Sequence, residues 1–97
     1  MAQGPPQPVR EEQVTQTELT LIAIHRAPAV PLADICERYF NIKPKVADRR
    51  ARLNQLPVPA WRLGTRKSPF MVHVKDLAER IDTARESAAE SWKKSQL

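Results

Sequence analysis

The residues with the clearest chemical potential are basic side chains gathered in one short stretch. Residues 41–67 hold eight of the sixteen Lys and Arg residues and one acid, Asp48, so this stretch has a net charge of +7. The rest of the chain carries eight basic and ten acidic side chains, a net charge of −2. The eight basic residues of the stretch are Lys43, Lys45, Arg49, Arg50, Arg52, Arg62, Arg66 and Lys67.

Positive charge concentrated on one part of a small domain is typical of nucleic-acid binding. The alternative, a solvated basic face without a ligand, stays open at this point. Enzymatic chemistry is disfavoured, because two histidines, one cysteine and scattered acids form no recognisable catalytic constellation. His73 has no further ligand residue at metal-binding spacing, and His25 fits a structural role. We therefore predict no enzyme activity, no metal and no cofactor.

The composition also limits where the protein works and how it is built. Its 97 residues suit one domain. The single cysteine, Cys36, excludes an intrachain disulfide, and no apolar run is long enough to span a membrane. We therefore expect a cytoplasmic protein. Residues 1–14 are rich in proline and polar groups and are predicted to be a flexible tail, followed by a domain at 15–92 and a frayed end at 93–97.

Three helices are predicted before the hairpin described below. Thr15 and Glu18 have the spacing of a capping box, which favours a helix from 15 to about 25, although a strand competes. A loop over 26–31 follows. Residues 32–40 carry one apolar stripe that includes Cys36, which we interpret as a core residue. A turn at Asn41 and Ile42 leads to a third helix at about 44–55.

The third helix has two unlike faces. On a helical wheel its alanines share one arc, and Lys45, Arg49 and Arg52 share roughly the opposite one. Arg50 falls within the apolar arc. Its side chain either pairs with an acid of the preceding helix, Asp34 or Glu37, or extends past the edge of the arc; the sequence leaves both open.

Two alternating runs, 60–63 and 70–74, flank a polar segment and predict a β-hairpin whose tip carries Arg66 and Lys67. Trp61 and Phe70 are either a base-stacking pair or cross-strand core residues, and we favour the core. A last helix at about 75–92 carries one stripe that includes Ala88 and Trp92. Its final turns either pack on the first helix or meet a second copy, and the homodimer is favoured.

This order of elements is that of a winged helix-turn-helix domain, mainly α with a small β-hairpin and excisionase- or MerR-like in layout. In such a domain Lys45, Arg49 and Arg52 reach DNA in the major groove, and Lys43 lies where backbone N–H groups also hold a phosphate. Arg66 and Lys67 at the wing tip contact the backbone or the minor groove. Arg62 lies along the wing, and Arg50 completes the eight basic residues that we predict to bind DNA.

The chain also resembles the pyocin activator protein (PrtN-type) regulators of bacteria and their phages. The resemblance covers about residues 18–82 and rests on VPLADICERYF, KPKVADRRA, LPVPAWRLG and SPFMVHVKDLAERID. The layout is similar to phage excisionase-like and AlpA-like domains too. The resemblance implies a sequence-specific activator of phage-derived or bacteriocin genes that binds double-stranded DNA, with RNA polymerase as a further candidate partner.

Two other functions remain open from the sequence. An excisionase-like architectural protein would bend DNA with the same wing and helix during recombination. A phage-encoded inhibitor would use the basic face against an acidic protein surface. Strong bending with little sequence preference would favour the first, and an absence of DNA binding at low salt would favour the second.

Overall fold

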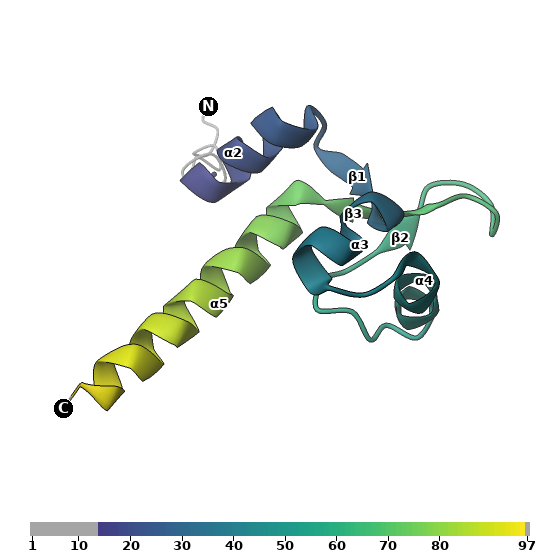
Figure 1. Ribbon diagram of the computed structural model, residues 1–97. Helices are drawn as coiled ribbons and strands as arrows, with labels where there is room; N and C mark the ends of the chain where they lie inside the picture. The colour runs from purple at the N-terminus through teal and green to yellow at the C-terminus, as the bar shows by residue number, and fades with distance from the viewer. Residues whose placement is uncertain (1–13, 97) are drawn as a thin grey trace, which may run out of the picture.

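The computed structural model describes residues 14–96, so the predicted tail lies outside the described residues except for Val14. The fold is mainly helical with one small antiparallel sheet (Figure 1). In chain order the elements are α2 (Gln16–His25), β1 (Ala29–Pro31), α3 (Leu32–Phe40), α4 (Pro44–Arg52), β2 (Trp61–Arg62), β3 (Phe70–His73) and α5 (Val74–Ser95).

The first described helix, α2, lies against the beginning of α5. Thr15 caps α2, because its side-chain oxygen accepts a hydrogen bond from the backbone N–H of Glu18, 3.0 Å away. This confirms the predicted helix over the strand. Leu21 is buried, and the hydroxyl of Thr17 donates to the Asp82 carboxylate of α5 at 2.7 Å. The helix therefore braces α5 through both apolar and polar contacts.

The predicted loop over 26–31 was wrong for its second half, where Ala29–Pro31 forms the edge strand β1. The sheet order is β1-β3-β2, and Val30 lies opposite Val72, both side chains being buried. A three-residue strand shows no detectable alternation in a sequence, and Pro31 argued against a strand. Proline is nevertheless tolerated here because β1 is at the edge of the sheet.

The helix pair α3–α4 follows the prediction closely. Asn41 adopts the left-handed conformation, with φ 57°, and ends α3 as expected. The second helix, α4, ends at Arg52, three residues before the predicted end at Gln55. Asn54, with φ 54°, is also left-handed and cannot continue the helix.

The predicted hairpin is present, with a register that separates its two aromatic residues. Trp61 is opposite Met71, and Arg62 is opposite Phe70. Since successive side chains of a strand point to opposite faces, Trp61 and Phe70 lie on different faces of the sheet. Their interpretation as a cross-strand core pair was therefore wrong. Phe70 packs against the core on the face that also carries Val72.

The core lies between α3, α4, the sheet and the first two turns of α5. Ile35, Cys36, Val72 and Leu77 have no exposed surface. Fully burying an aliphatic side chain such as Ile35, Val72 or Leu77 contributes about 1.5–3 kcal/mol. Beyond this core α5 extends as a long free helix (Figure 1), and every residue from 83 to 96 is exposed.

Candidate nucleic-acid interface

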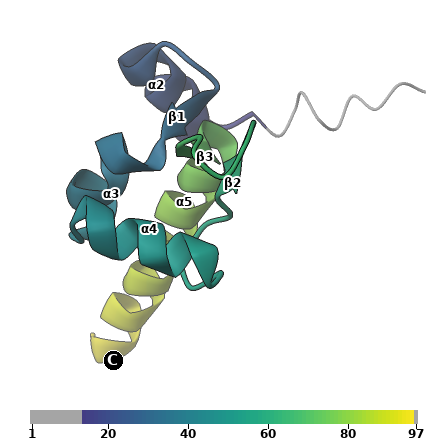
Figure 2. The same cartoon turned by 90° about the vertical axis from the view of Figure 1, so that its right-hand side faces the viewer.

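A groove of about 580 Å³ runs between α4 and the beginning of β3. It brings together three of the predicted site residues, Lys45, Arg49 and Arg52, all from α4. Pro69 and Phe70 form its opposite side, and the start of α3 contributes Leu32 and Ala33. Figure 2 shows α4 lying across the front of the molecule, with the sheet above it. The groove is thus open, cationic and bordered by the base of the hairpin.

The packing of α4 explains why its cations share this groove. Ala47 has no exposed surface and Ala51 only 6%, so the alanine side of α4 is pressed against the core. The helical repeat then directs Lys45, Arg49 and Arg52 to solvent. The small alanine side chains allow α4 to lie close to α3, which fixes the position of the cationic side.

Asp48 also lines this groove, and the sequence analysis did not select it as a site residue. Its carboxylate is 3.4 Å from Arg52 Nε and 3.9 Å from an Nη atom of Arg62, and its side chain is 49% exposed. The only signal in the sequence was that Asp48 is the sole acid in residues 41–67. The acid pairs with two of the cations and lowers the positive charge of the groove.

Arg62 occupies a different position from the other cations. Its guanidinium carbon is 4.2 Å from the centroid of the Phe70 ring, and its side chain is only 23% exposed. Its Nε is buried without a hydrogen-bond partner in the described part of the chain. Arg62 therefore links β2 to β3 through Phe70 and to α4 through Asp48, so its contacts run toward α4 as well as along the hairpin.

The loop between β2 and β3 presents Arg66 and Lys67, both exposed, at its tip. The backbone N–H of Ser68 donates to the carbonyl of Thr65 at 2.9 Å, and that of Lys67 donates to the Thr65 hydroxyl at 3.2 Å. These bonds close a turn that holds the two cations at its centre. In Figure 1 this loop and α4 lie on the right, far from the free end of α5.

The model of the family described as "Pyocin activator protein PrtN" matches residues 17–88. The chain belongs to this pyocin activator family. The match confirms the resemblance predicted from residues 18–82. No curated protein and no solved structure was found to match the chain. The pyocin activator family is one of regulatory proteins, not of enzymes, and its description indicates an activator of transcription.

Arg50 lies within the matched part of the pyocin activator model but outside the α4 groove. It is exposed and lines a second, apolar groove on the side of α4 that faces α5. Among residues 14–96, both ion pairs of the structure involve Asp48, so Arg50 pairs with neither Asp34 nor Glu37. The sequence left two positions open for Arg50, and the structure shows the second: its side chain extends past the edge of the apolar arc. The structure therefore separates Arg50 from the other cations of α4.

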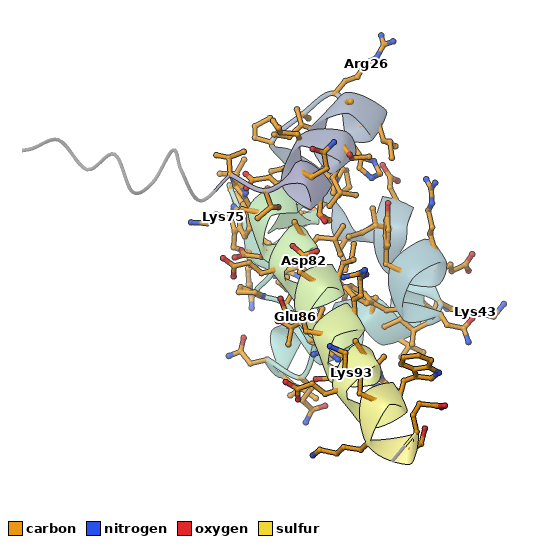
Figure 3. All side chains as sticks on the ribbon, turned by 90° about the vertical axis from the view of Figure 1, so that its left-hand side faces the viewer. Arg26, Lys43, Lys75, Asp82, Glu86 and Lys93 are labelled. Atoms are coloured by element: carbon orange, nitrogen blue, oxygen red, sulfur yellow. The ribbon has the colours of Figure 1, made fainter. Side chains whose placement is uncertain are left out.

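Lys43 precedes α4 as its N-cap residue and is exposed. Figure 3 shows its side chain directed outward at the start of the helix. The first backbone N–H groups of a helix have no intrahelical partner and favour an anion. Lys43 is therefore the cation closest to such a position in this member of the pyocin activator family.

Cys36, the length and hydropathy of the helices, and His73 concern the structure away from the groove. Burial, together with the nearby Glu37 carboxylate, raises the pKa of the Cys36 thiol, which agrees with its interpretation as a core residue. Within residues 14–96, no helix is both long and apolar enough to cross a membrane. His73 caps α5, since its Nδ1 accepts a hydrogen bond from the Lys75 backbone N–H at 3.0 Å.

Proposed function

We propose that the protein is a sequence-specific, DNA-binding activator of phage-derived or bacteriocin genes. The observation that carries the proposal is the joint placement of Lys45, Arg49 and Arg52 in one open groove of a chain from the pyocin activator family. Its α3–turn–α4 unit, followed by a hairpin, supports the assignment as a winged helix-turn-helix. Double-stranded DNA is then the first partner and RNA polymerase the second.

In this proposal α4 enters the major groove, and α3 braces it from behind. The major groove distinguishes all four base pairs, and an arginine that donates two hydrogen bonds to guanine is the commonest specific contact. Arg49 and Arg52 lie on the exposed side of α4 and are assigned to base edges, with Lys45 on bases or phosphates. Lys43 is assigned to a phosphate at the start of α4.

The hairpin contributes the remaining contacts. Arg66 and Lys67 are assigned to the phosphate backbone or minor groove beside the α4 site. Arg62 is assigned chiefly to holding β2 against α4, because little of its side chain is exposed. Arg50, directed to the other side of α4, is assigned no DNA contact. These assignments narrow the eight predicted residues to six that face DNA.

The proposal predicts that Arg49→Ala and Arg52→Ala each reduce sequence discrimination while leaving the fold intact. A bidentate base contact is worth about 1–3 kcal/mol of discrimination, or roughly fivefold to 150-fold in relative affinity. Binding to cognate and random duplexes is compared by fluorescence anisotropy, with circular dichroism melting as the folding check. Lys93→Ala is the control, because Lys93 lies on the outer face of α5 (Figure 3).

The same comparison separates the proposal from its rivals. Equal losses on cognate and random DNA would restrict Arg49 and Arg52 to phosphate contacts and favour architectural binding. Unmeasurable binding of the unmodified chain at low salt would contradict DNA binding altogether. A basic face that binds protein would then be the better explanation.

A further inference from the structure

The second half of α5 carries an apolar stripe that is uncovered within residues 14–96. The stripe begins inside the core with Leu77, which has no exposed surface, and continues through the half-buried Ile81. Ala84, Ala88 and Trp92 prolong it at intervals of four residues, all on one side of the helix. Trp92 is 63% exposed, although indole is among the most favourable side chains to bury.

An apolar groove of about 300 Å³ lies where this stripe meets the core. Phe40 and Ile42 line one side, and Ile81 and Ala84 of α5 line the other. Arg50 and Arg80 also line this groove, and no acid does. An apolar floor with guanidinium groups beside it is a favourable environment for an aromatic ring, because cations are attracted to the ring face.

We propose that the occupant is a second copy of this chain, with α5 paired antiparallel to α5 of its partner. Ala88 lies midway between Ala84 and Trp92, so a twofold axis near Ala88 brings each Trp92 level with Ala84 of the partner subunit. That position is the end of the partner's groove. Each Trp92 then packs into the other copy's groove, beside the partner's Arg80.

The geometry of α5 supports this pairing. Alanine at positions 84 and 88 allows close approach of the two helices, and the exposed segment 83–96 is about 20 Å long. The paired segment ends where the C-terminus of each α5 reaches the core of the partner subunit. The contact is short compared with a standard interface, so the dimer is expected to be weak in solution and favoured by DNA that carries two half-sites.

The acidic positions Asp82 and Glu86 lie on the side of α5 opposite the stripe (Figure 3), so they stay outside the proposed contact.

This inference does not depend on the DNA-binding proposal, because the surfaces are different. The α4 groove and the free end of α5 lie at opposite ends of the molecule (Figure 1). Trp92 lies beyond the residues matched by the family model, so the inference concerns this chain itself. The pairing proposal and the DNA-binding proposal can therefore each fail without the other.

Sedimentation equilibrium of the purified full chain without DNA tests the pairing. From about 10 μM to 1 mM, the average mass is expected to rise from monomer toward dimer. Trp92→Ala is expected to weaken the dimer at least tenfold with unchanged thermal unfolding. The matched control is Leu63→Ala, which removes a side chain that is 80% exposed on the hairpin. A monomer throughout, or a dimer that Trp92→Ala leaves unchanged, would overturn the proposal.

Cysteine cross-linking tests the axis and direction of the pair. Ala88→Cys is expected to give a disulfide-linked dimer on mild oxidation, whereas Glu86→Cys on the outer face is expected to give no disulfide link. A mixture of Ala84→Cys and Ser91→Cys chains, both of which keep Trp92, is expected to form mixed disulfide-linked dimers. Antiparallel pairing places residue 91 level with residue 85 of the partner subunit, next to position 84, and positions 84 and 91 lie on the same side of α5. Two outcomes would contradict the antiparallel pair: a disulfide link in Glu86→Cys but not in Ala88→Cys, or no mixed disulfide-linked dimer. Cys36 is buried and does not interfere.

Discussion

At the scale of single residues, Asp48 has the most informative environment. It lies among the cations that are assigned to DNA, and its carboxylate contacts both Arg52 and Arg62. A negative charge in such a groove repels phosphates, which weakens binding to every DNA sequence. If α4 binds DNA as proposed, the pair with Asp48 also favours one orientation of Arg52, and hence the sequences that match it. We therefore propose that Asp48 lowers overall affinity and raises discrimination.

Asp48→Asn is therefore expected to tighten binding to random DNA by about twofold to fivefold, because one exposed anion near the phosphates is removed. Preference for the cognate duplex is expected to fall. Competition assays with cognate and random DNA measure both quantities. Glu86→Gln, which removes an acid from the outer face of α5, is the control. Unchanged discrimination, with or without a change in affinity, would contradict the role assigned to Asp48.

The sequence located the basic cluster but did not sort its members. The wheel of α4 correctly grouped Lys45, Arg49 and Arg52, because their spacing determines their side of the helix. The position of Arg62 depended on contacts with Phe70 and Asp48, which are distant in sequence and follow from the strand register. Local spacing contains no information about such contacts.

At the scale of elements, the helix pair was predictable and the sheet only partly so. The amphipathic pattern of residues 32–40 and the turn at Asn41 are local signals, and both were confirmed. The edge strand β1 was missed because three residues that pair with a strand 40 or more positions away show no local pattern. The hairpin was predicted from alternation, but its register was set by the length of the loop between the strands.

The hairpin tip is the element whose proposed contribution is purely electrostatic. Replacing both Arg66 and Lys67 with Ala is expected to weaken binding to all DNA sequences and to reduce the slope of log K against log salt by up to about two units. Sequence preference should persist, because α4 is unchanged. Salt titrations monitored by anisotropy provide the measurement. A slope equal to that of the unmodified chain would remove the hairpin tip from the interface.

At the scale of the whole molecule, we assign separate roles to the two ends of the structure. The radius of gyration is 16.5 Å, compared with about 12 Å for a compact domain of this size, because α5 projects far beyond the core. One end presents the cationic groove and the hairpin, and the other presents Trp92. A projecting helix with an uncovered apolar stripe gains stability only by contact with another molecule, which is why we assign it to pairing.

The extent of α5 shows what the sequence could not determine. The stripe from Leu77 to Trp92 was visible as a helical pattern, but where the core ends along it was not. That boundary depends on how far α2, α3 and α4 reach along α5, a property of the tertiary packing. Packing on α2 and contact with a second copy were therefore both open. In the structure α2 covers only the first part of α5.

The central claim, sequence-specific DNA binding, is tested most directly by selection from a pool of random duplex DNA at two salt concentrations, followed by sequencing. We expect enrichment of a defined motif at both salt concentrations, with a repeated half-site if the chain pairs through α5. Salt-sensitive binding without enrichment would contradict sequence reading and favour an architectural role. Absence of DNA binding at both salt concentrations would contradict the proposed function and would favour a protein as the partner of the basic groove.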